Sequence, residues 1–67
     1  MTQKEFIDYI ANKYDRLTLS RPEAAHEADL SVNGIINFTK DGQIRAFKAG
    51  NRIKYLAADL ATFMGYK

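Results

Sequence analysis

The stretch that most constrains the fold is residues 29–40, in which a short turn is followed by an amphipathic segment. Ser31 stands where a helix N-cap is needed, because its hydroxyl can accept a hydrogen bond from a free backbone N–H of the first turn. Ile35 and Phe38 are three residues apart and therefore share one helix face, which we predict to be buried. The opposite face carries Asn33, Ile36, Asn37 and Lys40.

The charge distribution is more informative than the modest formal net charge of +2. Residues 1–30 carry four basic side chains against six acidic ones, whereas residues 31–56 carry five basic side chains against Asp41 alone. A positive middle segment is the pattern expected of a surface that meets phosphate. An ordinary solvated face would carry the same residues, so charge alone does not decide between the two interpretations.

The length and composition restrict the class of protein. A chain of 67 residues forms one domain with a small core. It has no cysteine, which excludes disulfides and thiolate metal sites, and the single His26 does not suffice for a zinc site. No apolar run approaches the length of a membrane helix, about 20 residues, and no signal-peptide pattern opens the chain. We therefore expect a soluble protein with neither a metal nor a cofactor, and with no membrane partner.

The residue content does not favour an enzyme. There is no Gly-rich phosphate loop, and His26 has no evident nucleophile to activate. Glu23 and Glu27 share a helix face, but capping and solvation explain this pair more simply than paired catalytic carboxylates do. The four tyrosines do not indicate a tyrosine recombinase, because the chain is too short for the Arg and His cluster of that chemistry.

The first eighteen residues predict an amphipathic helix of about four turns that ends before Leu19. Thr2 and Glu5 have the spacing of a capping box. We expect this helix to complete the small core, while Tyr9 and Tyr14 near its flank leave a partner-binding role open. Its apolar stripe consists of Phe6, Ile7, Ile10, Tyr14 and Leu17.

A second helix is predicted to begin after Ser20, with Pro22 in the first turn and Glu23 placed to close a capping box. We expect Glu27 to lie on its outer, solvated side and Leu30 to point into the core from the following turn. Small side chains let another helix approach closely, as in the first helix of a helix-turn-helix. They are Ala24, Ala25 and Ala28.

After Gly42, which can cap the preceding helix, two strand-like runs at 43–48 and 52–56 flank a turn at 49–51. Gly-Asn within that turn predicts a β-hairpin. We expect its polar residues to cluster where the hairpin would touch a neighbouring groove or backbone, although an exposed, soluble turn has the same composition. These residues are Lys48, Asn51, Arg52 and Lys54.

Residues 57–64 predict a closing helix, with Asp59 in its first turn and Leu60, Phe63 and Met64 on one side. No repeat, low-complexity segment or linker interrupts the chain. We therefore predict a single domain over residues 1–67, in which an N-terminal helix, 1–18, is added to a core, 19–64. The expected fold class is mainly α with a small β-hairpin.

The ordered set of residues from Leu19 to Met64 resembles the small winged helix-turn-helix domains related to the MerR regulators, often labelled the excisionase-type DNA-binding domain. The chain departs from that pattern at Asp29, where glycine is common, at Leu56, where proline is common, and at Gly34 within the second helix. The matching positions are Leu19, Ser20, Glu23, Ala24, Ala25, Ser31, Ile35, Phe38, Gly42, Ile44, Ala46, Lys48, Gly50, Arg52, Asp59, Leu60, Phe63 and Met64.

The resemblance implies that the second helix enters the major groove of double-stranded DNA and that the hairpin, the wing, contacts the flanking backbone or minor groove. Asn side chains pair well with adenine and Ile packs on the thymine methyl, so we expect a preference for A·T-containing steps. The implied base-reading residues are Asn33, Ile36, Asn37 and Lys40. The implied backbone or wing contacts are Ser31, Lys48, Asn51, Arg52 and Lys54.

By resemblance, the leading function is that of an excisionase of a phage or mobile element. Such a recombination directionality factor binds adjacent DNA sites cooperatively through self-association, bends the DNA and directs a partner integrase. A small transcriptional regulator of the same fold is the first alternative, and a protein-interaction adapter acting through its N-terminal helix is the second. The implied location is the cytoplasm of a bacterial cell or phage-infected host, in association with the nucleoid.

Overall fold

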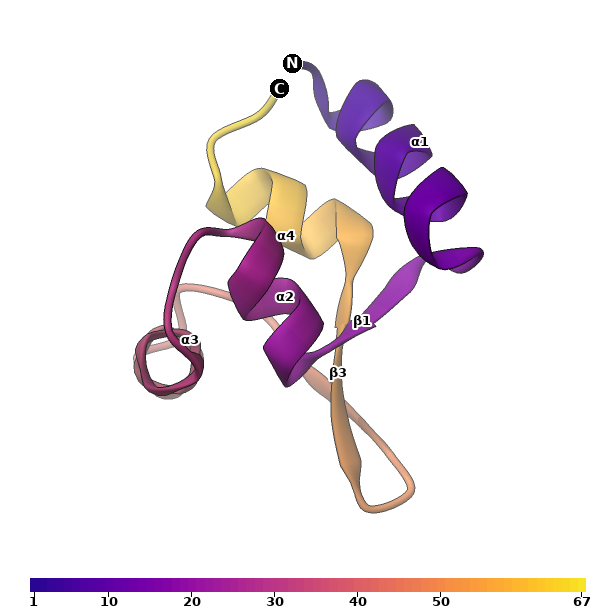
Figure 1. The fold of residues 1–67 in the computed structure, drawn as a ribbon. Coiled ribbons are helices and arrows are strands. Elements are labelled where there is room, and N and C mark those ends of the chain that lie inside the picture. Colours follow the sequence, from indigo (N-terminus) through magenta and orange to yellow (C-terminus); the bar gives the residue numbers. More distant parts are fainter.

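The computed structural model describes all 67 residues and contains four helices and one three-stranded antiparallel sheet (Figure 1). About half of the chain is helical, so the expected class, mainly α with a small β-hairpin, is confirmed. In chain order the elements are α1 (Gln3–Tyr14), β1 (Thr18–Ser20), α2 (Arg21–Glu27), α3 (Val32–Lys40), β2 (Phe47–Ala49), β3 (Arg52–Leu56) and α4 (Ala57–Phe63).

Local capping signals explain where the first three helices begin. The Thr2 hydroxyl accepts a hydrogen bond from the backbone N–H of Glu5 at 3.1 Å, and the Glu5 carboxylate accepts from the backbone N–H of Thr2 at 2.7 Å. Ser20 and Glu23 form the same reciprocal capping box at the start of α2. Ser31 accepts from a backbone N–H of the first turn of α3 at 3.0 Å. Each cap satisfies a donor that the helix itself leaves free.

Helix α1 is shorter than predicted and excludes Leu17. It ends at Tyr14, because Asp15 adopts a left-handed conformation with φ of 56° while its N–H bonds to the Ala11 carbonyl oxygen. The chain then turns into β1, and Leu17 is 52% exposed rather than part of the apolar stripe. The predicted fourth turn of this helix was therefore wrong.

The sheet has the strand order β1-β3-β2, with Leu19 opposite Tyr55 and Lys48 opposite Ile53. Strand β3 spans the predicted 52–56. Strand β1 was not predicted. Strand β2 covers Phe47–Ala49 instead of the predicted 43–48, because Ile44 is buried in the core and its segment does not pair with β3. Ala49, which was predicted to lie in the turn, pairs with Arg52. Gly50, with φ of 65°, provides the positive φ of the two-residue hairpin turn.

Every helix and two of the three strands contribute buried side chains to the core. Helix α2 adds Ala24 and Ala25, whose small size lets α3 pack closely. Because Ile10 comes from α1, that helix packs on the core of its own chain. The largest fully buried side chains are Tyr55 from β3, Ile10 from α1, Leu19 from β1, Ile35 from α3 and Leu60 from α4.

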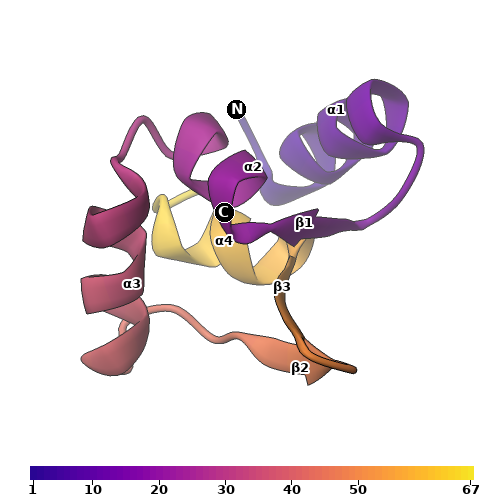
Figure 2. The ribbon, with the colours of Figure 1, turned by 60° about the horizontal axis from the view of Figure 1, so that its bottom comes forward.

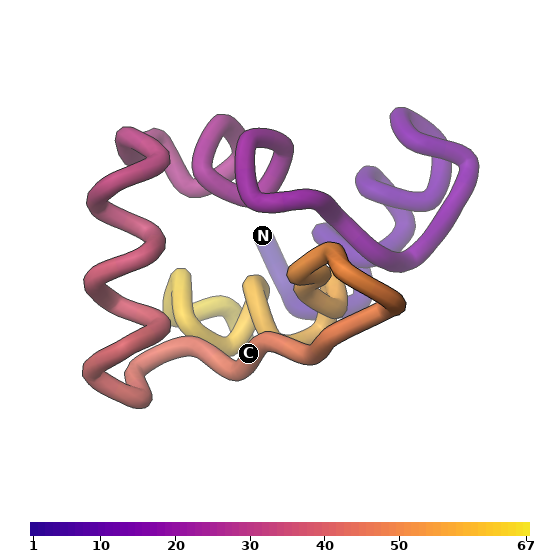
Figure 3. Tube along the Cα trace, turned by 90° about the horizontal axis from the view of Figure 1, so that it is seen from below, coloured from indigo at the N-terminus to yellow at the C-terminus, as the bar shows by residue number.

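The arrangement of the elements separates two sides of the molecule. Helix α3 runs along one side of α2 and α4, and the β2–β3 hairpin projects beyond the body (Figures 1 and 2). Seen from below, α3 and the hairpin face the viewer, and α1 lies behind them (Figure 3). The two chain termini lie close together at the end opposite the hairpin turn (Figure 1).

Candidate nucleic-acid interface

Helix α3 presents three of its four expected base-reading residues to solvent. Asn33, Asn37 and Lys40 are exposed, and Ile36 is half-buried. The exposed Ser31 uses its hydroxyl oxygen to cap the helix, and its O–H is still able to donate. The outer face of α3 therefore offers amide donors and acceptors, one cation and a partly covered apolar group.

The opposite face of α3 is fixed to the body. Ile35 is completely buried, and the ring of Phe38 packs edge-on against that of Phe63 with centroids 5.1 Å apart. The Thr39 hydroxyl donates to the Ile35 carbonyl oxygen at 2.6 Å and lies 2.8 Å from the Tyr55 hydroxyl of β3. Aromatic packing and hydrogen bonds together hold the outer face in one orientation.

The turn between α2 and α3 explains one departure from the winged-domain pattern. Asp29 has φ of 57°, the left-handed conformation that glycine adopts most readily and that Asp tolerates better than most residues. The Leu30 N–H then bonds to the Ala25 carbonyl oxygen at 2.8 Å, and the Leu30 side chain packs against the core as expected. Asp29 thus adopts the backbone conformation that glycine would provide.

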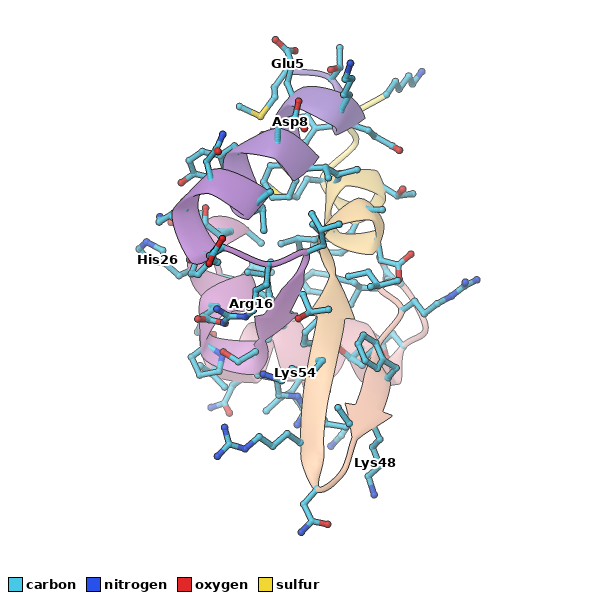
Figure 4. All side chains as sticks on the ribbon, turned by 90° about the vertical axis from the view of Figure 1, so that its right-hand side faces the viewer. Glu5, Asp8, Arg16, His26, Lys48 and Lys54 are labelled. Carbon is cyan, nitrogen blue, oxygen red and sulfur yellow. The ribbon has the colours of Figure 1, made fainter.

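The cations of the hairpin diverge instead of forming one cluster. Arg52 and Lys54 are two residues apart on β3 and share a face of the sheet, whereas Lys48 lies opposite Ile53 and belongs to the other face. Figure 4 shows Lys48 and Lys54 on opposite sides of the hairpin. Arg52, Lys48 and Asn51 are exposed, and Lys54 is half-buried. The hairpin therefore has two cationic sides.

The salt bridges leave the positive charge of residues 31–56 unneutralised. The two in the structure join Lys13 to Glu27 at 2.8 Å and Arg16 to Glu23. Both connect α1, or the segment after it, to α2. The basic side chains that take part in no salt bridge include Arg21, Lys40, Arg45, Lys48, Arg52 and Lys54.

Glu27 is not on a solvated outer face, as the sequence had suggested, because its carboxylate is covered by α1. It accepts hydrogen bonds from Lys13 Nζ at 2.8 Å and from Tyr14 Oη at 2.6 Å, and its side chain is 6% exposed. Burial alone would raise the pKa of Glu27, but these hydrogen bonds outweigh it and hold the pKa below its usual value. Burial and the bond to Glu27 raise the pKa of Tyr14 to about 12. The cluster joins α1 to α2.

One pocket, of about 320 Å³, lies between the start of α2 and the hairpin. It contains Arg52 and Lys54 as well as Arg21, which the sequence did not single out. No local signal identifies Arg21, because it reaches the hairpin only through the pairing of β1 with β3. The lining residues are Ser20, Arg21, Pro22, Asn51, Arg52, Ile53 and Lys54.

A buried tyrosine connects this pocket to α3. Tyr55 is fully buried, and its hydroxyl lies 3.4 Å from Arg21 Nε and 2.8 Å from Thr39 Oγ1. Since the Thr39 proton goes to the Ile35 carbonyl oxygen, Tyr55 donates to Thr39 and accepts from Arg21. Elements α2, β3 and α3 therefore meet at one hydroxyl group.

Together these features define a small, mainly helical protein with a three-stranded antiparallel sheet and unpaired basic side chains on α3 and its hairpin. No group of three His, Cys, Asp or Glu side chains is placed to hold a metal ion. None of the helices has the length and apolar character to cross a membrane. A scan against protein-family models, a search of curated proteins and a search of solved structures each found no match to this chain.

Proposed function

We propose that this protein binds double-stranded DNA as a winged helix-turn-helix domain, with α3 in the major groove and the β2–β3 hairpin as the wing. One observation carries the proposal. The five basic side chains of residues 31–56 form no salt bridge, and this segment includes α3 and the hairpin on one side of the molecule. By contrast, Lys13 and Arg16, which precede this segment in the sequence, are neutralised by the α2 glutamates Glu27 and Glu23.

The exposed side chains of the hairpin and of α3 suit different parts of DNA. Lys48, Arg52 and Lys54 on the hairpin suit phosphate oxygens, which supply affinity and register. Asn33 and Asn37 on α3 suit base edges, where an amide can pair with adenine. The fixed contact of α3 with the body supports this division, since a reading surface must keep its orientation relative to the wing.

At a finer level we propose that the protein is an excisionase of a phage or mobile element. Several copies would bind adjacent sites, bend the DNA and direct an integrase toward excision. The small size supports this idea, because one module of 26 × 24 × 17 Å covers too little DNA to specify a site alone. A transcriptional regulator of the same fold remains the second candidate on the same geometry.

The adapter alternative would have to use the exposed side of α1, which carries Tyr9, because Phe6 and Ile10 are buried in the core of their own chain. The Phe6 ring also packs against Tyr66, with centroids 5.4 Å apart. Helix α1 therefore uses its main apolar side internally.

A salt titration of DNA binding tests the proposal. Wild-type protein should bind element-flanking DNA tightly and lose affinity steeply as salt rises, because binding releases counterions. The double variant Arg52→Ala, Lys54→Ala should reduce the slope of log K against log salt by about 2. The matched control is Lys4→Ala, Lys67→Ala, which removes two exposed cations without a salt bridge.

The outcomes of this titration are distinct. No binding of the wild type to either element-flanking or random DNA at low salt would overturn the proposal. If DNA binding holds, an in vitro excision reaction with the element's integrase separates the two candidates. Stimulation of excision supports the excisionase, and a change in promoter activity without it supports the regulator.

A further inference from the structure

The pocket between the start of α2 and the hairpin is basic. Its charged side chains are Arg21, Arg52 and Lys54, and no acidic residue lines it. None of the three cations forms a salt bridge elsewhere in the structure. Like charges gathered without a counter-charge repel one another, and an anion bound between them would relieve that repulsion.

Arg21 is held in this pocket by a hydrogen-bond chain. Its Nε–H donates to the Tyr55 hydroxyl, which donates to Thr39, which in turn donates to the Ile35 carbonyl oxygen. All bonds in the chain point the same way, so each polarises the next. The Nε–H is thereby engaged, while the two terminal nitrogens of the guanidinium remain available for an external acceptor.

We propose that this pocket binds one backbone phosphate of duplex DNA through Arg21, Arg52 and Lys54, and that Tyr55 is the positioning residue that orients Arg21. The inference rests on the proposed DNA binding and deepens it by adding a contact outside both α3 and the wing. Two terminal guanidinium nitrogens match two phosphate oxygens in a bidentate arrangement. Asn51 adds an amide donor from the hairpin turn.

This site would fix the register of α3 on the DNA. The start of α2 lies on the side of the molecule that also carries α3 and the hairpin (Figure 3). The Tyr55 hydroxyl connects the phosphate contact of Arg21 to Thr39 on α3. A phosphate held by Arg21 therefore sets where the exposed face of α3 meets the bases.

The first test compares Arg21→Ala, Arg21→Lys and the control Lys4→Ala in the salt titration of DNA binding. Arg21→Ala should weaken binding about tenfold or more and reduce the salt slope by about 1. Arg21→Lys should restore the slope but only part of the affinity, because Lys lacks the bidentate fork. If Arg21→Ala binds like Lys4→Ala while Arg52→Ala is impaired, the pocket inference fails and the proposed function stands.

The second test separates positioning by Tyr55 from a merely structural role. Tyr55→Phe keeps the ring in the core and removes the hydroxyl. It should weaken binding about threefold in the wild type, and distinctly less in an Arg21→Ala background. An equal loss in both backgrounds would show that Tyr55 acts without Arg21 and would overturn the positioning role.

A third measurement distinguishes the source of the phosphate. Amide resonances of residues 20–22 and 51–54 should shift on titration with a short DNA duplex and remain nearly unchanged with an equal concentration of ATP. Shifts with ATP but not with the duplex would overturn the inference in favour of a nucleotide site. Absence of DNA binding by the wild type would overturn the proposed function together with this inference, which is a different outcome from an inert Arg21.

Discussion

Glu27 shows how a single residue joins the N-terminal helix to the body. A carboxylate that is nearly covered would be costly without partners, but Lys13 and Tyr14 both donate to it. The same bond stabilises the charged form of Lys13, because the hydrogen bond to Glu27 raises the pKa of the ammonium. This cluster orders α1 against α2 without adding any charge to the DNA-binding side that we propose.

The pH dependence of stability tests the role of Glu27. Its pKa is lowered in the folded state, so its contribution is present above the ordinary value of 4.5 and is lost as the pH falls through the folded pKa. At pH 7, Glu27→Gln should lower the free energy of unfolding by about 1–2 kcal/mol. Denaturation at pH 7 and pH 3 should show a smaller acid-induced loss in this variant than in the wild type.

Asp8 supplies the control for that experiment. It lies on the exposed side of α1, and its carboxylate has no salt-bridge partner. Asp8→Asn should therefore retain the wild-type acid sensitivity. An unchanged acid response in Glu27→Gln would show that the hydrogen bonds from Lys13 and Tyr14 do not stabilise the ionised carboxylate.

Asn37 and Arg52 should separate specificity from affinity. Asn37 lies on the exposed face of α3, and Asn37→Ala should cost about 1–3 kcal/mol on specific DNA while relaxing sequence preference. Arg52→Ala should weaken binding to specific and random DNA alike. Competition assays with both DNAs measure the difference, and equal losses in the two variants on both DNAs would contradict this division of roles.

At the scale of elements, Gly34 tests how α3 is built. A Cβ at this position would lie 3.2 Å from the Ser31 capping oxygen. A shift of that oxygen by a few tenths of an ångström would relieve the contact and still leave its hydrogen bond to the Gly34 N–H, which is 3.0 Å long, within bonding distance. Gly34→Ala should therefore raise stability by a few tenths to about 1 kcal/mol through helix propensity. Thermal unfolding measures this gain, and Ser31→Ala, which removes the cap, should lose about 1 kcal/mol.

The DNA affinity of the Gly34→Ala variant then decides between two possible roles of Gly34. Equal or better affinity would show that glycine only loosens the helix, as we expect. A lower affinity in a more stable protein would show that the bare backbone at Gly34 approaches a phosphate.

Helix α1 contributes to the core and is not an appendage. Ile10 is completely buried, so Ile10→Ala should cost about 2–5 kcal/mol. A domain of this size has a free energy of unfolding of about 3–10 kcal/mol in total, so the variant should lose a large share of its stability and melt at a clearly lower temperature than the wild type. Leu17→Ala is the control, since Leu17 is 52% exposed. Similar melting curves for the two variants, followed by circular dichroism, would show that α1 is dispensable.

The sequence predicted those parts of the fold whose signals are local. The caps at Thr2, Ser20 and Ser31 and the bounds of β3 depend on neighbouring residues and were confirmed. Strand β1 has three residues, and it exists only because it pairs with β3 more than thirty positions later, so no local pattern could reveal it. Contacts made by tertiary packing escaped prediction for the same reason.

The candidate site likewise has a part that local sequence signals predict and a part that depends on tertiary contacts. The exposed stripe of α3 followed from helical periodicity, and Asn33, Asn37 and Lys40 are exposed as expected. Arg21 could not be found, because its place beside the hairpin is created by the sheet. The role of the Tyr55 hydroxyl was missed too, because its partners Arg21 and Thr39 come from other elements of the fold.

The dimensions of the whole molecule set how it can occupy DNA. Its longest extent is 26 Å, which corresponds to about 8 base pairs at 3.4 Å per base pair. A duplex of about 10 base pairs should therefore bind one copy, and one of about 30 base pairs should bind three. Sedimentation velocity with duplexes of increasing length measures this stoichiometry. Saturation of the long duplex by a single copy would contradict adjacent binding by several copies.

The hairpin turn has a consequence for how this protein can diversify. No heavy atom lies within 4 Å of where a Cβ at Gly50 would stand, and Asn51 and Arg52 beside it are exposed. Insertions or exchanges of charge at this turn leave the buried side chains untouched, provided that the turn keeps its positive φ. We therefore expect variants with a longer turn, or with a different charge at the turn, to fold as the wild type does.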